Sequence, residues 1–267
     1  MTEIRITSHY VSDSVHTGKT RNLARRLTGL TVGLMALIAW TATVQAQTIN
    51  VPNGSFESPT PPPGYPATPQ VDFWQKSPQP PGVPLPGGIT WEQLAGVFPN
   101  TPSGSPDHID NVTGNQAAYM FAIPGVALFQ QLNSSFTVGN SYTLSLDILG
   151  GGGITEGSSF LMSLYFLDGA NSPVTVGATP ITYTAAGFPN PTHLYEYSLT
   201  LPSVRAGDTW AGKDIGVELL STFGTGAGYW DVDDVRLAVV PEPGTISLLA
   251  LGASGLLLVR WRARRRK

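Results

Sequence analysis

The stretch that decides the fold is Tyr142-Thr143-Leu144-Ser145-Leu146-Asp147-Ile148, which follows a Gly139-Asn140 turn. Its large apolar residues occupy every second position, with small or polar residues between them. Because successive side chains of a strand point to opposite faces of a sheet, this alternation is typical of an antiparallel strand with one buried face. The sequence therefore predicts a β-sheet that packs one face against a core.

Other stretches extend this pattern through residues 47–240. His193 to Leu201 alternates in the same way, and Phe160 to Leu167 is almost continuously apolar, which indicates a central strand. No run of ten or more residues there has helical periodicity. We therefore predict an all-β fold, an antiparallel jelly-roll β-sandwich of about ten strands. Weaker strand candidates are residues 49–57, 89–94, 117–123, 127–132, 174–178, 215–221 and 229–239.

Two segments interrupt the strand pattern. Residues 58–88 hold many of the prolines, which cannot join a central ladder, and are predicted to form a long surface loop. Gly150 to Gly153 is predicted to be a flexible loop tip. It does not have the spacing of a phosphate-binding loop, and no predicted helix follows it.

The charge of the chain is distributed unevenly. The formal net charge is −3, but residues 47–240 carry four Lys/Arg against fifteen Asp/Glu, which gives −11. Nucleic acid binding requires basic patches, so we exclude nucleic acid as a partner. Cysteine is absent, so the fold depends on its apolar core or on a metal ion.

The first 46 residues have the order of an export signal. Arg21, Arg25 and Arg26 precede an apolar stretch at 27–40, and Val44-Gln45-Ala46 is a small-residue cleavage site. We predict that residues 1–46 are a signal peptide.

The last 27 residues combine three features in order. Pro241-Glu242-Pro243 comes first, and residues 246–259 then form an uncharged run of fourteen residues. As a helix this run rises ~21 Å, against a bilayer core of about 30 Å, and Trp261 and the arginine stems extend its reach. We predict a transmembrane helix at 245–261. A basic tail orients it with that end in the cytoplasm and the domain outside: Arg260, Arg262, Arg264, Arg265, Arg266 and Lys267.

This order closely resembles the PEP-CTERM sorting signal of Gram-negative bacteria that produce exopolysaccharide. The resemblance implies recognition and cleavage by the membrane enzyme exosortase at Pro241, Glu242 and Pro243. The helix would then be a transient anchor in the inner membrane that holds the domain in the periplasm before release to the cell envelope or the exterior. The alternative is an ordinary C-terminal membrane anchor with proline in its linker, which leaves the topology unchanged.

Residues 47–240 resemble carbohydrate-binding-module-like, or galactose-binding-like, jelly rolls. Three patterns carry the resemblance: Asn53 to Glu57, the stretch from Gln131 through Gly139 to Ser145, and Trp230 to Leu237. In such sandwiches the first and last strands lie side by side. The resemblance implies a structural Ca²⁺ there, with Glu57 and Asp233 as side-chain ligands. The alternative is that these acids face solvent at a sheet edge.

We expect no catalytic residues. No Gly-x-Ser-x-Gly, His-Glu-x-x-His or P-loop motif is present, and the only crowded carboxylates are those of residues 231–234, which the resemblance assigns to calcium. The expected function is therefore a non-enzymatic exported protein that binds or organises polysaccharide, with Trp74 and Trp210 as the exposed stacking platforms. The alternatives are a purely structural biofilm-matrix or adhesive protein and, third, a glycan-active enzyme with a pair of facing carboxylates.

Overall fold

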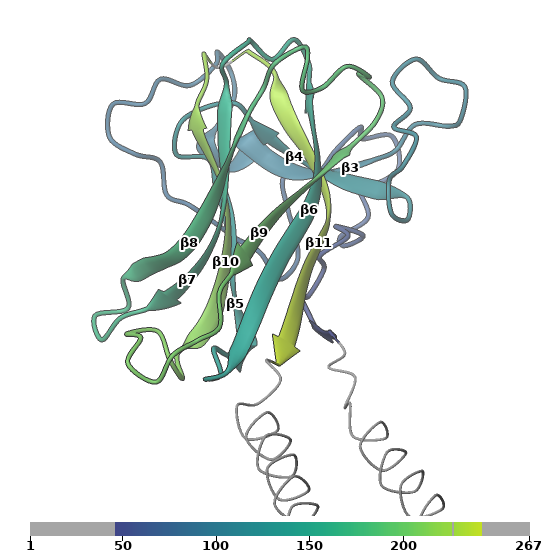
Figure 1. Cartoon of the computed structure of the whole chain (residues 1–267). Coiled ribbons are helices and arrows are strands. Elements are labelled where there is room, and N and C mark those ends of the chain that lie inside the picture. Colours follow the sequence, from purple (N-terminus) through teal and green to yellow (C-terminus); the bar gives the residue numbers. More distant parts are fainter. Residues whose placement is uncertain (1–45, 226, 242–267) are drawn as a thin grey trace, which may run out of the picture. The chain divides into compact units, whose positions relative to one another are not determined.

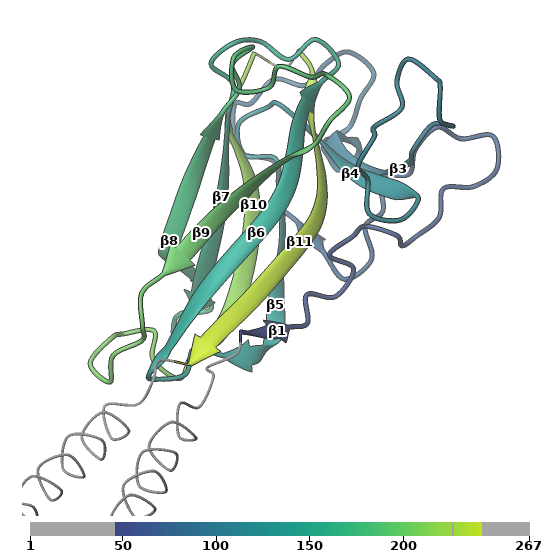
Figure 2. The same ribbon diagram turned by 45° about the vertical axis from the view of Figure 1, so that its right-hand side comes forward.

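Two antiparallel β-sheets face each other in the computed structural model, which describes residues 46–225 and 227–241 (Figures 1 and 2). One sheet has the strand order β3-β4-β11-β6-β9, with β1 paired to β11, and the other has the order β2-β5-β10-β7-β8. The predicted all-β sandwich is confirmed. Its elements are β1 Gln47–Ile49, β2 Gln75–Lys76, the 3₁₀ helix η1 Trp91–Leu94, β3 Ala95–Pro99, β4 Gln116–Phe121, β5 Ala127–Ser135, β6 Asn140–Gly151, β7 Ser159–Leu167, β8 Pro173–Thr182, β9 Tyr195–Leu201, β10 Asp214–Phe223 and β11 Tyr229–Pro241.

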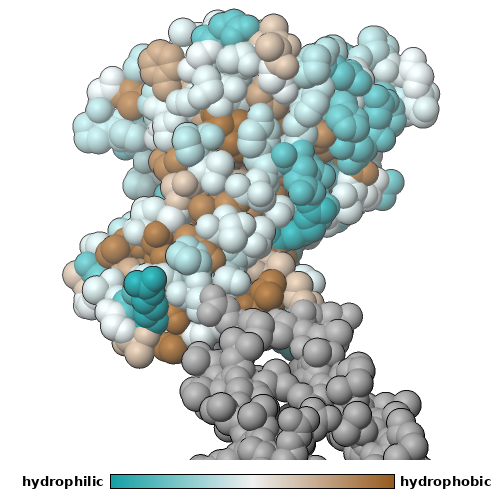
Figure 3. Space-filling view, in the orientation of Figure 1, coloured by the Kyte–Doolittle hydropathy of each residue, from teal (hydrophilic) through white to brown (hydrophobic). Residues whose placement is uncertain are grey.

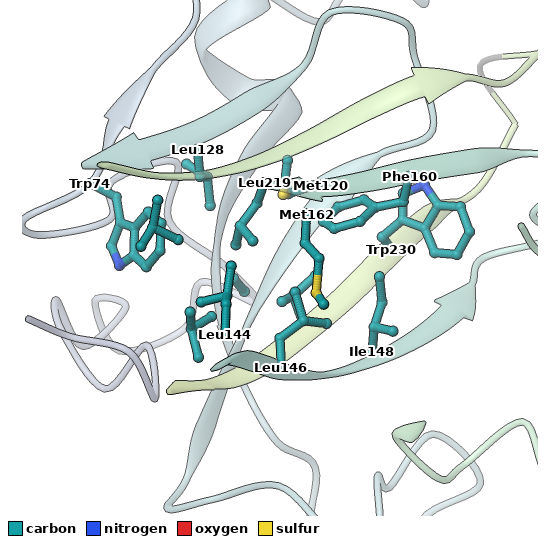
Figure 4. Close-up of a cluster of buried hydrophobic side chains, with 14 of the residues drawn as sticks. Trp74, Met120, Leu128, Leu144, Leu146, Ile148, Phe160, Met162, Leu219 and Trp230 are labelled. Atoms are coloured by element: carbon teal, nitrogen blue, oxygen red, sulfur yellow. The ribbon is translucent and has the colours of Figure 1, made fainter. Parts of the chain in front are cut away.

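The core fills the space between the two sheets. Leu144, Leu146 and Ile148 of β6 point inward and are fully buried, as their alternation predicts. Figure 4 shows them opposite apolar side chains that include Phe160 and Met162 of β7. Burial of apolar side chains contributes roughly 1.5–3 kcal/mol each, so this layer supplies most of the driving force for folding. Outside the core, apolar and polar residues are interspersed on the surface seen in Figure 3.

The first and last strands lie together, as expected from the resemblance. Gln47 to Ile49 pair antiparallel with Val239 to Leu237. Further along, the backbone N–H of Val235 donates to the carbonyl of Gly54 at 2.8 Å. A Cβ atom on Gly54 would lie only 2.4 Å from the carbonyl oxygen of Val235, so a glycine is needed for this close approach.

Two of the weaker strand predictions are wrong. Residues 91–94 form a 3₁₀ helix, since the side chain of Gln93 accepts from the backbone N–H of Thr90 and helps close a capping box. Residues 50–57 turn instead of continuing β1, with Asn53 and Phe56 at positive φ. The proline-rich segment 58–88 is mainly loop, as predicted, and contains only the two-residue strand β2.

Candidate active site

A pocket of about 690 Å³ lies on the outer face of the six-stranded sheet. Its base is formed where three neighbouring strands are in register, with Asp231 of β11 opposite Tyr119 of β4 on one side and Leu149 of β6 on the other. These side chains face outward because their neighbours Trp230 and Val232 are fully buried in the core. The strand alternation therefore places one carboxyl group at the base of the pocket.

Asp231 is enclosed to a degree that is unusual for a carboxyl group. Only 5% of the residue is exposed, and its Oδ1 atom has no hydrogen-bond partner among the described residues. Burial raises the pKa of Asp231 well above its usual range. Burial therefore favours the neutral form of this carboxyl group, which is the form required of a proton donor.

Aromatic side chains form much of the pocket wall. The rings of Tyr119 and Phe121 meet edge to face at 6.2 Å, and the ring of Phe121 is 6.3 Å from that of Tyr229. Tyr183 lines the pocket from the end of β8. Burial raises the pKa of the Tyr119 and Tyr229 phenols, and the nearby carboxyl groups of Asp231 and Asp107 raise that of Tyr229 further. The wall thus offers neutral aromatic faces to a ligand.

The Gly150–Gly153 run lies against these rings. A Cβ atom on Gly150 would meet the ring of Tyr183 at 2.4 Å, and one on Gly152 would meet the ring of Tyr229 at 2.2 Å. On Gly151 it would lie 2.9 Å from Oδ2 of Asp231. The run was predicted to be a flexible tip. Gly150, Gly151 and Gly152 are instead packed against pocket residues, because only a backbone without side chains leaves room for two tyrosine rings and a carboxyl group, whereas a Cβ atom on Gly153 would meet nothing within 4 Å.

Two loops complete the pocket, and we call residues 100–111 and 183–194 the flanking loops. They are joined to each other: Thr192 Oγ1 donates to Oδ2 of Asp110 at 3.1 Å, and Asn111 exchanges two hydrogen bonds with the backbone of Leu194 at 2.8 and 2.9 Å. The pocket is therefore enclosed by segments more than 80 residues apart in the sequence.

The sequence matches two family models. Residues 47–238 match the model described as HpiC1 cyclase, and residues 239–266 match the PEP-CTERM protein-sorting motif. The chain belongs to the HpiC1 cyclase family. The PEP-CTERM match confirms the predicted sorting signal, so this member of the family is exported and directed to the cell envelope, and the motif implies processing by exosortase.

Solved structures agree with the family in fold. An apo cyclase from Fischerella sp. is 20% identical, with a TM-score of 0.56 over 74% of this chain and 98% of the other. A Stig cyclase from Fischerella sp. TAU, solved with (3Z)-3-(1-methyl-2-pyrrolidinylidene)-3H-indole, is 21% identical, with a TM-score of 0.57 over 74% and 100%. A cyclase from the same source, solved with 4-(1H-indol-3-yl)butan-2-one, is 20% identical, with a TM-score of 0.56 over 74% and 100%. A search of curated proteins gives no match.

The expectation of a protein without enzymatic activity is overturned by this family match. That expectation assigned all the acids of residues 231–234 to calcium binding. In the structure, Asp231 and Asp233 have different surroundings. Oδ1 of Asp231 has no partner among the described residues, whereas Asp233 accepts the backbone N–H groups of Thr113 at 2.6 Å and Asp234 at 2.7 Å. Two nearby carboxyl groups in different environments can take different roles.

The two predicted calcium ligands are brought to the same loop. Oε1 of Glu57 accepts the N–H groups of Asn115 and Gln116, both at 2.8 Å, next to the contact between Thr113 and Asp233. Among the residues that the structure describes, no group of three or more Asp, Glu, His or Cys is placed to hold a metal ion. A Ca²⁺ ion would need main-chain or water oxygens to complete its shell. Calcium binding stays a prediction.

The two predicted tryptophan platforms do not line the pocket. The expected exposure of Trp74 is wrong: the residue is buried, its ring packs 5.5 Å from that of Phe56, and its Nε1 donates to the carbonyl of Asn53. Trp210 is partly exposed and meets Phe136 edge to face at 4.9 Å. Their role in sugar binding stays untested.

The residues predicted for sorting lie mostly outside the described part of the chain. Pro241 ends β11, whereas Glu242, Pro243, the 245–261 segment and the basic tail lie beyond it, as does the signal peptide up to residue 45. Within residues 46–225 and 227–241, no helix has the length and apolar character needed to cross a membrane.

Proposed function

We propose that the pocket is an active site in which Asp231 acts as the general acid in a cyclisation of a small, largely apolar molecule. The observation that carries this proposal is the buried Asp231 carboxyl group, unpartnered at Oδ1, in an aromatic pocket. Membership of the HpiC1 cyclase family supports it. The indole compounds with which the Fischerella structures were solved support an indole-sized substrate, which a pocket of about 690 Å³ would accommodate.

The proposed chemistry uses residues of this chain alone. Asp231 donates its proton to one carbon of an electron-rich double bond, which leaves a carbocation at the other carbon. The faces of Tyr119 and Tyr229 stabilise that charge through their π-systems. A second π-bond of the substrate attacks the cation and closes the ring by a carbon–carbon bond. The Asp231 carboxylate then removes a proton from the new ring system, so that the acid is regenerated.

This reaction has a simple signature. A proton is gained and a proton is lost, so product and substrate have the same mass. We would incubate the purified chain with indoles that carry an unsaturated side chain and search by liquid chromatography and mass spectrometry for isomers with a new retention time. Asp231→Asn keeps the shape of the side chain but cannot donate the acid proton, and should lower the rate by about 10²–10⁴-fold.

The matched control is Asp168→Asn, at the turn that follows β7 and far from the pocket. The Asp168 carboxylate accepts the N–H groups of Ala170 and Ser172, and an asparagine oxygen can accept them too. This variant should retain full activity. Isomer formation that proceeds equally well in Asp231→Asn would overturn the assignment of Asp231.

Polysaccharide binding is the second candidate, and one observation favours it. Tyr119, Phe121 and Tyr229 are partly exposed on neighbouring strands, an arrangement on which pyranose rings can stack. We infer that the same pocket would be used, since Trp74 is buried. Oligosaccharides of the host's exopolysaccharide that displace an indole from the pocket would support this function. A purely structural matrix role, the remaining alternative, makes no use of the pocket.

We further infer that the domain works outside the inner membrane. The PEP-CTERM match supports export, and the apolar segment before the basic tail would hold the chain in the membrane until exosortase acts. The periplasm would then be the first compartment in which the pocket meets its substrate.

A further inference from the structure

The pocket contains a second carboxyl group, that of Asp107, which has no role in the proposed chemistry. Among the described residues, its lining includes two carboxyl groups, Asp231 at the base and Asp107 in a flanking loop, and contains no Lys, Arg or His. All four cationic Lys/Arg side chains of the described residues lie elsewhere: Lys76, Arg205, Lys213 and Arg236. The described lining therefore presents no positively charged side chain to a ligand that enters the pocket.

The two carboxyl groups have different surroundings. Asp231 is buried at the base of the pocket, with 5% of the residue exposed. Asp107 is exposed in its loop, where a ligand can reach its carboxyl group. Asp107 and Tyr229 line the same pocket, so the carboxyl group and the aromatic wall face one ligand space. A positive group placed between that wall and Asp107 would be attracted by both.

Among the residues that the structure describes, two of the four cations are held by groups outside the pocket. Arg236 is engaged by three carboxylates, with Asp234 at 2.7 Å, Glu196 at 2.8 Å and Asp147 at 3.5 Å. Lys76 donates to the backbone carbonyls of Glu92 at 2.5 Å and Ala95 at 2.6 Å. With these cations engaged elsewhere and a net charge of −11 from four Lys/Arg and fifteen Asp/Glu in residues 47–240, the surroundings favour a cationic ligand.

We propose that the substrate of this pocket is an aromatic amine, whose ammonium group is bound between Asp107 and the ring of Tyr229 while its aromatic part occupies the apolar interior. The inference rests on the proposed function, and it names the substrate class of the same site. The two acids then have different roles: Asp107 selects the substrate by its charge, and Asp231 donates the proton.

Three indoles of nearly the same size separate this inference from the proposed function. They are 4-(1H-indol-3-yl)butan-2-one, which is neutral, 4-(1H-indol-3-yl)butan-2-amine, which is a cation, and 3-(1H-indol-3-yl)propanoate, which is an anion. Calorimetric titration of the purified 267-residue chain at pH 7 should show the amine binding on the order of tenfold more tightly than the ketone. The anion should bind least tightly. The preference for the amine should shrink at high salt, because Asp107 is exposed and its field is screened.

Two variants test whether the Asp107 carboxyl group causes the preference for the amine. Asp107→Asn should reduce the amine-to-ketone preference to about twofold or less and leave the affinity for the ketone unchanged. Asp168→Asn removes a carboxylate that does not line the pocket and should leave the preference intact. Equal binding of amine and ketone by the native chain, or a preference that survives Asp107→Asn, would overturn the assignment of Asp107 while the proposed active site stands. Failure of all three indoles to bind would overturn the proposed active site itself.

Discussion

Gly151 leaves the space that the carboxyl group of Asp231 occupies. A Cβ atom on Gly151 would lie 2.9 Å from Oδ2 of Asp231 and 2.8 Å from the ring of Tyr229. Both distances are shorter than carbon atoms tolerate, so a side chain at this position must displace the acid or the ring. The two strands that carry these residues, β6 and β11, are paired at this point. The acid therefore depends on the absence of a side chain on the neighbouring strand.

Gly151→Ala should weaken the binding of 4-(1H-indol-3-yl)butan-2-one at least tenfold, because the displaced Tyr229 ring and Asp231 carboxyl group distort the pocket. Overpacking of this kind costs about 1–3 kcal/mol of stability, so the variant should still fold. Titration calorimetry measures the binding and urea denaturation the stability. Gly169→Ala is the control, since nothing lies within 4 Å of the added Cβ. Unchanged affinity in Gly151→Ala would show that the pocket adapts to the new methyl group.

The free energy of unfolding should fall as the pH rises from about 4 to 7. Burial raises the pKa of Asp233 to about 7, and it also raises the pKa values of Asp147 and Asp231. In this window the unfolded chain has lost these protons and the folded chain still binds them, so stability is greatest below the unfolded pKa and declines toward the folded one. A loss on the order of 3 kcal/mol is expected.

Urea denaturation at intervals between pH 4 and pH 8 measures this dependence. Asp231→Asn cannot lose a proton, so its stability should decline less steeply than that of the native protein over the range. A native protein whose stability rises through the window would show that these carboxyl groups are ionised in the folded state.

Calcium, if bound by Glu57 and Asp233, should raise the melting temperature. A ligand that binds only the folded state contributes about 2.7 kcal/mol at a concentration one hundred times its Kd, which amounts to a few degrees for a domain of this size. Asp233→Ala should lose most of the response. Melting curves in millimolar calcium and in chelator decide the matter: if they coincide, the two carboxylates serve only the N–H groups of the loop at 113–116.

Sorting should depend on Pro241, Glu242 and Pro243, because the prolines keep this segment extended and accessible to a processing enzyme. Replacement of all three by alanine should leave the chain uncleaved and retained in the membrane fraction. Mass spectrometry of the mature native protein provides the measurement. Detection of Arg260 to Lys267 in that mature form would identify the segment as a permanent anchor.

Much of the fold follows from local pattern, because strand alternation is a property of neighbouring residues. Tyr142 to Ile148 lies within β6, and Phe160 to Leu167 within β7, a central strand of its sheet. The predictions that are wrong, for Trp74 and for residues 91–94, depend on contacts with residues distant in sequence or on a side-chain hydrogen bond. Trp74 is buried by Phe56 and Asn53, which lie about twenty residues earlier, and residues 91–94 become a 3₁₀ helix through a capping box.

The site was harder to predict than the fold. Asp231 was recognised as one of several crowded acids, but its burial and raised pKa result from Tyr119, Leu149 and loops far from it in sequence. One local signal was present: an aspartate between Trp230 and Val232 must point away from the core when both neighbours point into it. The glycine run was the other signal, since four consecutive glycines next to a strand indicate a surface on which large side chains rest.

The hydrogen bonds of Asp110 and Asn111 join the flanking loops to each other, whereas the acid at the base of the pocket is held by the main-chain register of β4, β11 and β6. Loops tolerate substitution and insertion far better than the strands that they connect. Evolution can therefore alter the recognition part of this scaffold without moving its proton donor. Relatives that share the sheet but differ in the two loops are expected to accept different molecules while they retain one type of chemistry.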